Sequence, residues 1–308
     1  MEKHKKVLEE VKPSFFETTF AIAATYFLNQ NADICVIEVG LGGRLDCTNV
    51  INPDLCVITN IGLDHTEFLG NNLATIAAEK AGIIKQGIPV VIGESLTETT
   101  PVFIQKAQQT NSPLVFADQH ANDITKWKCQ LTGCYQQKNK NTAYQALYIL
   151  REQGYNITDE SIRKGFKQVC TLTGLRGRWE TLKEKPLTIC DTGHNAHGLQ
   201  YVGKQLATYK KGQVHIVFGM VKDKDINAAI AMLPKNATYY FTQAQTPRAL
   251  PASELQQIAA NHNLHGEIYT NIETAIKAAY QKMQHNDMLF IGGSNYLVGE
   301  ALSLPDFQ

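Results

Sequence analysis

The chain lacks an excess of charge of either sign. Its 308 residues include 29 Lys plus Arg and 29 Asp plus Glu, so the formal net charge is zero. A sequence-wide basic field for nucleic acid is therefore absent, and so is an acidic, disordered composition. No apolar run approaches the roughly 18 residues needed to cross a bilayer. The opening MEKHKKVLEEVKPS has no apolar stretch, so we expect neither a signal peptide nor a membrane or nucleic-acid partner.

The sequence also lacks a CxxC pair, and its seven cysteines are an odd number. Cys35, Cys56 and Cys190 lie in apolar, strand-like runs, where a small buried hydrophobic side chain is the expected role. We therefore expect free thiols in a reducing, cytoplasmic protein.

Short β-branched apolar runs alternate with longer helical patterns. Strands are expected at Ile34–Val39, Cys56–Thr59, Pro89–Ile92, Leu114–Phe116, Leu187–Cys190, Val214–Phe218, Thr238–Phe241, Glu267–Tyr269 and Met288–Ile291. Helices are expected at Phe15–Asn29, Leu73–Lys85, Thr99–Gln109, Thr142–Glu152, Asp159–Gln168, Leu199–Thr208, Asn227–Leu233, Ser253–Asn261 and Ile272–Gln284. Near-continuous apolar strands separated by helices are typical of a parallel sheet covered on both faces, which predicts an α/β protein.

The alternation pauses between about Trp127 and Arg178, and a polar link, LKEKP, precedes its restart. We place a domain boundary near Leu182. Residues 1–181 are expected to form a mostly parallel sheet domain, and residues 182–308 a smaller, Rossmann-like, doubly wound domain.

Glu38 lies at the carboxyl end of the first predicted strand and opens the segment EVGLGGRLDCTN. A carboxylate there cannot continue a buried strand unless it is paired or binds a metal ion. The carboxyl ends of parallel strands are also where open α/β sheets bind ligands. The glycines permit close backbone approach, but GLGGR does not match the GxGxxG dinucleotide pattern. Both a salt-bridged strand end and a ligand site remain open.

Polar residues follow the next predicted strand in NIGLDHTEFLG, where His65 is either a metal ligand or an ordinary loop histidine. Donors from two strand ends can converge on one Mg²⁺ ion. Lys80, in AEKAGII, has the plain interpretation of a lysine near a helix end.

The segment DTGHNAHG directly follows the predicted strand Leu187–Cys190. Asp191 at the strand end, with His194 and Asn195 at the start of a helix, would form a nucleotide or phosphate contact set. His194 and His197 have the spacing of a zinc pair, but no third soft ligand is suitably placed. GLQYVGKQ fits GxxxxGK, yet it lacks the Ser or Thr that would bind Mg²⁺ and has helical character. No other Gly-Lys dipeptide occurs, so the sequence contains no Walker A motif.

Together these segments resemble the folylpolyglutamate synthase/dihydrofolate synthase family, relatives of the muramyl peptide ligases. The matching strings, in the family's order, are SFFE, EVGLGGRLDCTN, NIGLDHTEFLG, AEKAGIIK, KNTAYQAL, LRGRWE and DTGHNAHG. The resemblance implies an ATP-dependent amide ligase. A dihydropteroate or folate carboxylate takes the γ-phosphoryl group of ATP, and the amino group of L-glutamate attacks the acyl phosphate. It also implies an incomplete P-loop-type first domain and a monomer when full length. Two Mg²⁺ ions would stabilise the developing charge.

Site residues follow from the matching positions. Glu38 and His65 would ligate Mg²⁺, and Lys80 would be carbamylated to hold a second Mg²⁺. His65, Lys80 and Arg178 would be the catalytic residues. ATP would contact Asn141, Arg178, Asp191 and His194. The pterin side of the pocket would be lined by Ser14, Phe15, Phe16, Glu17, Leu45, Asp46 and Cys47.

Two departures from the family pattern accompany the resemblance. Where the family usually has Asp-Gly-Ala-His-Asn, this chain has Asp-Thr-Gly-His-Asn, from Asp191 to Asn195. The phosphate loop would precede Met1, so we expect a truncated chain with little or no ligase activity alone. The alternatives are a muramyl peptide ligase-like enzyme, a non-catalytic folate- or nucleotide-binding remnant and, less well supported, a nicotinamide dehydrogenase.

Overall fold

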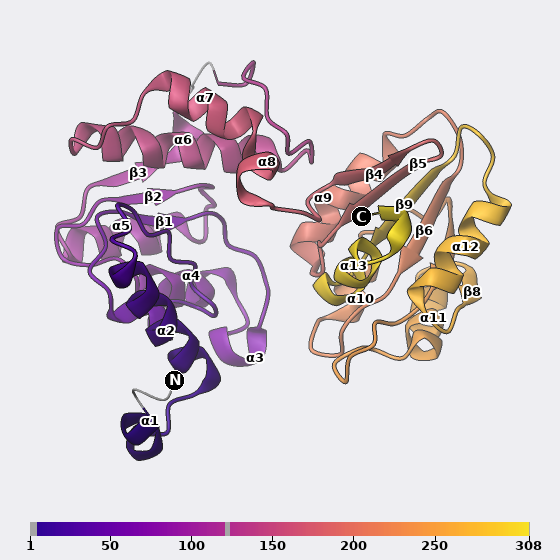
Figure 1. Cartoon of the computed structure of the whole chain (residues 1–308), viewed down its shortest axis with the longest axis horizontal. Coiled ribbons are helices and arrows are strands. Elements are labelled where there is room, and N and C mark those ends of the chain that lie inside the picture. The colour runs from indigo at the N-terminus through magenta and orange to yellow at the C-terminus, as the bar shows by residue number, and fades with distance from the viewer. Residues whose placement is uncertain (1–4, 121–123, 308) are drawn as a thin grey trace. The chain divides into compact units, whose positions relative to one another are not determined.

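A computed structural model describes residues 5–120 and 124–307 (Figure 1). The residues form two compact units, one of Met1–Ile61 with Glu67–Gln119 and one of Gly62–Thr66 with His120–Gln308. The domain boundary near Leu182 stays a prediction. Among the described residues, no helix is both long enough and apolar enough to span a membrane.

The first unit is built on a three-stranded parallel sheet in the order β1-β2-β3. Its strands are β1 (Cys56–Ile58), β2 (Val90–Ile92) and β3 (Leu114–Phe116). Its helical elements are α1 (Lys5–Val11), α2 (Phe15–Asn29), η2 (Cys47–Val50), α3 (Thr66–Leu69), α4 (Leu73–Ala81), α5 (Thr100–Gln109) and η3 (Ala117–Gln119), with Thr66 assigned to the other unit. Ile76, Val90, Ile92 and Phe103 are fully buried between the sheet and α4 and α5. The predicted strands and helices of this unit are confirmed, apart from the first strand.

The predicted strand Ile34–Val39 is wrong. Residues 34–39 have no regular structure and pair with no described strand. Val36 is 91% exposed, and Cys35 is exposed as well, so its predicted burial is also wrong. An apolar composition suits a strand, but a strand needs a hydrogen-bonded neighbour, and β1–β3 do not supply one here. Glu38 is therefore an exposed residue and not the end of a buried strand.

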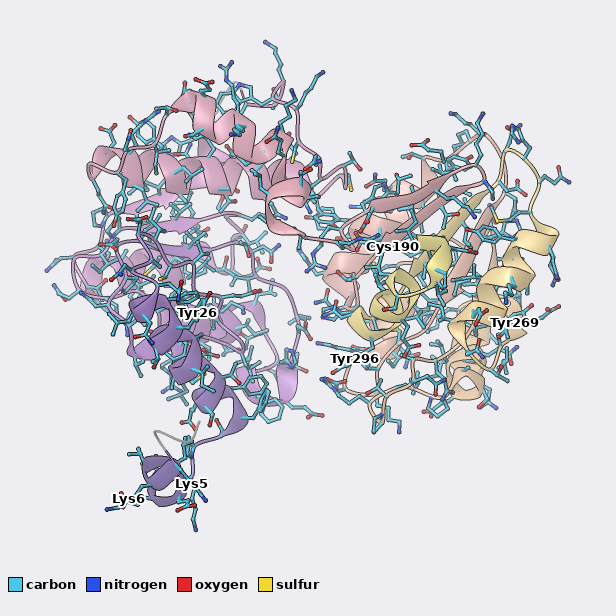
Figure 2. All side chains as sticks on the ribbon, viewed as in Figure 1. Lys5, Lys6, Tyr26, Cys190, Tyr269 and Tyr296 are labelled. Carbon is cyan, nitrogen blue, oxygen red and sulfur yellow. The ribbon has the colours of Figure 1, made fainter. Side chains whose placement is uncertain are left out.

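Helix α2 has the predicted bounds, because Ser14 and Glu17 form a capping box at its start. No residue of α2 is buried: Phe15 is 77% exposed and Tyr26, labelled in Figure 2, is 58% exposed. Together with residues 34–39, this helix gives the first unit an uncovered apolar surface.

The second unit holds a six-stranded sheet in the order β4-β5-β9-β6-β7-β8, parallel except for the antiparallel pair of β4 and β5. The strands are β4 (Glu180–Glu184), β5 (Leu187–Asp191), β6 (Val214–Phe218), β7 (Ala237–Phe241), β8 (Gly266–Ile268) and β9 (Met288–Gly292). The helical elements are α6 (Gln136–Glu152), α7 (Asp159–Lys167), α8 (Val169–Thr173), α9 (Ala196–Ala207), α10 (Ile226–Ile230), α11 (Ala252–Asn261), α12 (Ile272–Lys282), α13 (Asn295–Leu302) and η4 (Pro305–Phe307).

Helices cover both faces of this larger sheet. One core cluster joins the sheet to α9, α10 and α11 through Leu199, Ile230 and Leu255, and the other joins it to α12 and α13 through Ile276 and Leu297. The predicted doubly wound arrangement is confirmed. The predicted polar link LKEKP is wrong in part, because it contains the end of β4. That strand is a polar edge strand, paired on one side only, so it shows no apolar run.

A buried histidine makes the stability of this sheet depend on pH. His215 in β6 is 4% exposed, with Nδ1 2.9 Å from the Tyr240 hydroxyl and Nε2 3.4 Å from Asp287 Oδ2. Burial lowers the pKa of His215 below its ordinary 6.5, despite the opposing effect of Asp287 and with a smaller contribution from Lys282.

The unfolded state therefore binds a proton more readily than the folded state, and stability rises with pH in this range. We expect the free energy of unfolding to fall as the pH drops through 6.5, and to fall less in His215→Gln. Urea unfolding at several pH values between 5 and 8 measures both slopes. Equal slopes in the two proteins would show that His215 is not responsible.

Candidate functional site

In the first unit, Asp46 organises the glycine-rich loop that follows Glu38. Its Oδ2 accepts hydrogen bonds from the backbone N–H groups of Gly40 (3.1 Å) and Leu41 (2.9 Å). Its Oδ1 accepts from Thr48 N (3.0 Å) and Thr48 Oγ1 (2.5 Å). Burial opposes ionisation, but these hydrogen bonds lower the pKa of Asp46 overall. The carboxylate predicted to face the pterin is thus engaged by its own loop.

The same loop packs against the end of α4, where Lys80 lies. Arg44 donates from its backbone N to the Glu79 carbonyl (2.8 Å) and from Nη2 to Glu79 Oε1 (3.0 Å). A Cβ added at Gly43 would lie 3.0 Å from the Lys80 carbonyl oxygen. The structure therefore brings together the loop after Glu38 and the half-buried Lys80.

Close packing at this contact predicts that Gly82→Ala destabilises the first unit. An added Cβ would lie 2.4 Å from Arg44 Cβ and 2.5 Å from Arg44 Cα, so the backbone would have to move. We expect a loss of about 1–3 kcal/mol in the free energy of unfolding, measured with urea. Gly165→Ala is the control, because its Cβ would meet no atom within 4 Å, and it should be neutral or slightly stabilising. An unaffected Gly82→Ala variant would contradict the packing described here.

The segment Ser14–Glu17 has a clear local role. The Glu17 carboxylate accepts from Ser14 N (2.6 Å), and Glu17 N donates to Ser14 Oγ (3.2 Å). Phe15 and Phe16 are 77% and 70% exposed and meet edge to face. Leu45 is also 80% exposed and Cys47 is half-buried. That these residues line a substrate pocket stays a prediction.

In the second unit, Asp191 at the end of β5 is 2% exposed, and both oxygens of its carboxylate accept hydrogen bonds. Oδ2 accepts from the Tyr135 hydroxyl (2.6 Å) and from Trp179 N (2.7 Å), and Oδ1 accepts from Gly193 N (2.7 Å). Burial raises the pKa of Asp191 even though these three donors favour the ionised form. Asp191 thereby ties the Arg178–Trp179 segment to the loop before α9.

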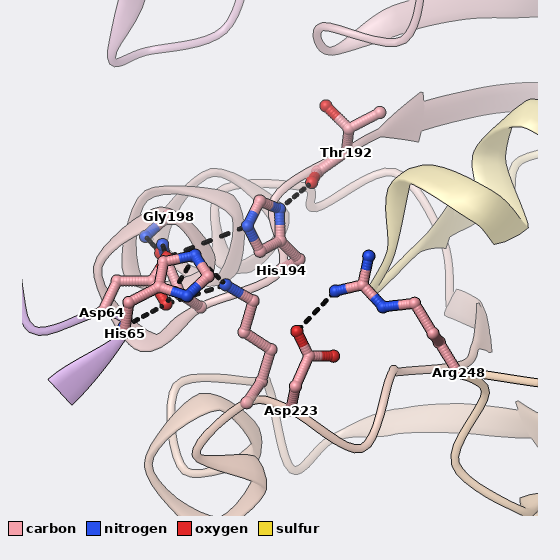
Figure 3. Close-up of polar contacts among 9 residues, drawn as sticks. Asp64, His65, Thr192, His194, Gly198, Asp223 and Arg248 are labelled. Atoms are coloured by element: carbon pink, nitrogen blue, oxygen red, sulfur yellow. Dashed lines mark hydrogen bonds and ion pairs between the residues drawn. The ribbon is translucent and has the colours of Figure 1, made fainter. Parts of the chain in front are cut away.

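His194 and Arg178 both contact Thr192. Arg178 donates to the Thr192 hydroxyl. His194 Nδ1 is 3.0 Å from the Thr192 carbonyl oxygen (Figure 3). A carbonyl only accepts, so Nδ1 carries the proton and Nε2 is unprotonated. Burial lowers the pKa of His194 below 6.5, so its ring is neutral at pH 7. Asn141 is half-buried on α6, and its place in a nucleotide site stays a prediction.

The loop that holds His65 belongs to the second unit and contacts two of its segments (Figure 3). Asp64 Oδ2 accepts from Asn195 Nδ2 (2.8 Å), and Asp64 Oδ1 accepts from Lys224 Nζ (2.8 Å). Lys224 Nζ also lies 3.2 Å from His65 Nε2. Burial works to raise the pKa of Asp64, but the bonds from Lys224 and Asn195 outweigh it and lower the pKa below 3.8.

Sequence reasoning selected Asn195, with Asp191 and His194, as a nucleotide or phosphate contact, but it did not select Asp64, Lys224 or Tyr135. Asp64 stands beside the selected His65 in DHT, so a polar neighbour was the available signal. Lys224 and Tyr135 gave none, because they meet their partners only in the fold.

The donors of the His65 loop fit a cation. Asp64 Oδ1 and His65 Nε2 converge on one positive charge, the Lys224 ammonium, which stands where a metal ion would meet the imidazole. Within residues 5–120 and 124–307, no group of three or more His, Cys, Asp or Glu side chains is placed to hold a metal ion. Glu38 and Lys80 belong to the first unit and His65 to the second, so their convergence stays a prediction.

Comparison with known proteins assigns the chain to a family. Residues 13–158 match the Mur ligase middle domain, and residues 177–295 match the Mur ligase, glutamate ligase domain. The dihydrofolate synthase/folylpolyglutamate synthase of Buchnera aphidicola subsp. Schizaphis graminum is 31% identical over 308 residues, which is 96% of this chain and 72% of that protein. The chain belongs to the folylpolyglutamate synthase/dihydrofolate synthase family. The Escherichia coli protein of the same description is 29% identical, covering 96% of this chain and 71% of its own length.

Solved structures of this family have the same fold. The Yersinia pestis bifunctional enzyme complexed with AMPPNP and Mn superimposes with a TM-score of 0.80 at 29% identity, over 94% of this chain and 71% of that one. Escherichia coli FolC in complex with DHPP and ADP gives a TM-score of 0.75 at 30% identity, over 86% of this chain and 64% of that one. The chain thus spans about two thirds to three quarters of the relatives' length.

These comparisons confirm the predicted α/β fold of two domains and the predicted ligase family, whose members are ATP-dependent glutamate ligases. ATP analogues, ADP and Mn are bound in structures of the relatives. The matches to folate-branch enzymes do not favour the muramyl peptide ligase alternative.

Proposed function

We propose that this chain adds L-glutamate to dihydropteroate or a tetrahydrofolate, using ATP to form an acyl phosphate. One observation carries the proposal. The motif residues Asp64, His65, His194 and Asn195, far apart in the sequence, meet in one half-buried polar cluster beside Arg178 and Lys224. Positive groups placed in a partly dry site stabilise the negative charge that phosphoryl and acyl transfer develop.

His194 supports the second step of this reaction. The amino group of glutamate must lose a proton before it attacks, and the neutral ring of His194 offers Nε2 as the acceptor. Asp191 is a positioning residue in this scheme, because its carboxylate is buried and accepts from Trp179 N and Gly193 N, the neighbours of Arg178 and His194 in the sequence. Arg178 and Asn141 are proposed to contact ATP.

The metal-binding residues are proposed to be Glu38 and His65, with Lys80 carbamylated to hold a second ion. A divalent cation there would neutralise charge on the phosphate and carboxylate oxygens. The cation-binding donors at His65 and the half-buried position of Lys80 beside the glycine loop support this assignment. We also propose a cytoplasmic monomer, consistent with seven free cysteines.

A substrate panel tests the proposal. Isothermal titration calorimetry should show binding of ADP–Mg²⁺ and of phosphorylated dihydropteroate, and no binding of a nucleotide-linked muramyl peptide. Selective binding of the muramyl compound, or of no compound in the panel, would refute the proposed substrate class.

A further inference from the structure

The Lys224 side chain is placed as an internal cation. It is only 6% exposed, and its ammonium lies 2.8 Å from Asp64 Oδ1 and 3.2 Å from His65 Nε2. An ammonium has donors and no acceptor, so the imidazole nitrogen that faces it must be the acceptor. The lone pair of His65 Nε2 is therefore directed at Lys224, and the ring proton of neutral His65 is on Nδ1.

The His65 loop is held in this position from both sides. His65 has a φ of 49°, in the left-handed region, and its backbone N donates to Asp64 Oδ1 at 2.9 Å. Asp64 Oδ2 is fixed in turn by Asn195, the N-cap residue of α9. The close approach of Nε2 to the ammonium thus belongs to an ordered loop, which Asp64 links to two other segments.

A nitrogen lone pair can serve one cation at a time. A divalent ion bound through Nε2 needs the same lone pair that now accepts from Lys224. The ammonium cannot withdraw without cost, because a nearly buried charge that leaves its partner must be resolvated. The arrangement therefore sets the ammonium and the ion in direct competition.

We propose that Lys224 is a tethered cation that occupies the ion-facing side of His65 and must be displaced before a divalent ion binds there. This inference rests on the proposed function, in which His65 is a metal ligand. Lys224 is a positioning residue in this role: its ammonium holds the Nε2 lone pair of His65 in place, and it sets the ion concentration at which the exchange occurs.

The test measures Mn²⁺ binding to the metal-free chain. Electron paramagnetic resonance gives the concentration of Mn²⁺ that stays free at each addition. Lys224→Met removes the competing ammonium, and we expect Mn²⁺ to bind about tenfold more tightly, the size of one charged hydrogen bond. Lys224→Arg retains a positive charge at this place and should bind Mn²⁺ about as the wild type does. Lys222→Met is the matched control, because it removes an equal charge from an exposed residue of the same segment.

His65→Gln separates this inference from the proposed function. If His65→Gln leaves Mn²⁺ affinity unchanged in an otherwise wild-type chain, His65 is not a ligand and the proposed metal site fails. If His65→Gln weakens binding but Lys224→Met does not tighten it, only the competition is refuted. Equal tightening by Lys222→Met would also refute it, because the effect would then be general charge.

A measurement on the wild-type protein tests the proposal without relying on variants that could misfold. Nitrogen NMR of the His65 ring, without metal, should show Nε2 unprotonated. Addition of Mg²⁺ should then shift the Lys224 ammonium resonance together with that of Nε2. Movement of the His65 signal alone would overturn the proposal.

Discussion

Asp191→Asn should lower the free energy of unfolding of the second unit by about 3 kcal/mol. The buried carboxylate accepts from Tyr135, Trp179 and Gly193, one or two donors on each oxygen. An Asn amide has one acceptor and one donor end, so it must face at least one of these N–H or O–H groups with its own NH₂. A buried donor left without an acceptor costs about 1–3 kcal/mol, and removing one partner of a buried charged network costs about 3–5 kcal/mol.

Urea unfolding measures this loss, and Tyr135→Phe is the matched control. That change removes a single donor, leaves both backbone bonds intact, and should cost only about 1 kcal/mol. If Asp191→Asn were as stable as the wild type, the carboxylate would not be the link between the Arg178–Trp179 segment and the loop before α9.

The second large effect concerns the chemistry of Lys80. In ¹³C-bicarbonate solution, the wild-type chain should give a carbamate ¹³C resonance that is entirely absent in Lys80→Arg. A lysine takes up CO₂ only through its neutral amine, and Lys80 is half-buried beside the glycine loop. Guanidinium stays protonated, so arginine keeps the charge and cannot form the carbamate.

Lys85→Arg controls for other lysines near the same helix end. Lys85 Nζ donates to the Asn49 carbonyl oxygen at 2.8 Å, so its amine nitrogen is already engaged by another part of the loop. The resonance should persist in Lys85→Arg. Its persistence in Lys80→Arg, or its absence from the wild type, would exclude Lys80 as the modified residue.

The sequence predicted most elements because their signals are local. Helix α2 begins at Phe15 as expected, since Ser14 and Glu17 cap it within four residues of chain. Strand β6 was predicted with its bounds because it is buried on both faces and reads as a continuous apolar run.

The elements that were predicted wrongly depend on contacts between distant segments and not on local signals. Residues 34–39 have a strand's composition, but pairing depends on a neighbour that local sequence does not identify. Strand β4 was missed because an antiparallel edge strand can be polar.

Some residues of the candidate site could also be predicted from local sequence, whereas their contacts with distant residues could not. Asp191 ends a strand, and His65 and His194 lie in the loops that follow strands, so their place at the carboxyl end of a sheet could be expected. The partner of His65 could not, since Lys224 is 159 positions away in the sequence and meets it only in the folded unit. The engagement of Asp46 with its own loop was also not predicted, because a carboxylate looks equally suited to bind a ligand or a turn.

A crystal of this chain grown with Mn²⁺ and a non-hydrolysable ATP analogue would test the central assignment. Anomalous diffraction at the manganese edge locates the ion independently of the protein coordinates. The account predicts a peak about 2.0–2.3 Å from both a Glu38 carboxylate oxygen and His65 Nε2, with Lys224 moved away from that nitrogen. A manganese peak remote from His65, with Lys224 still on Nε2, would contradict it.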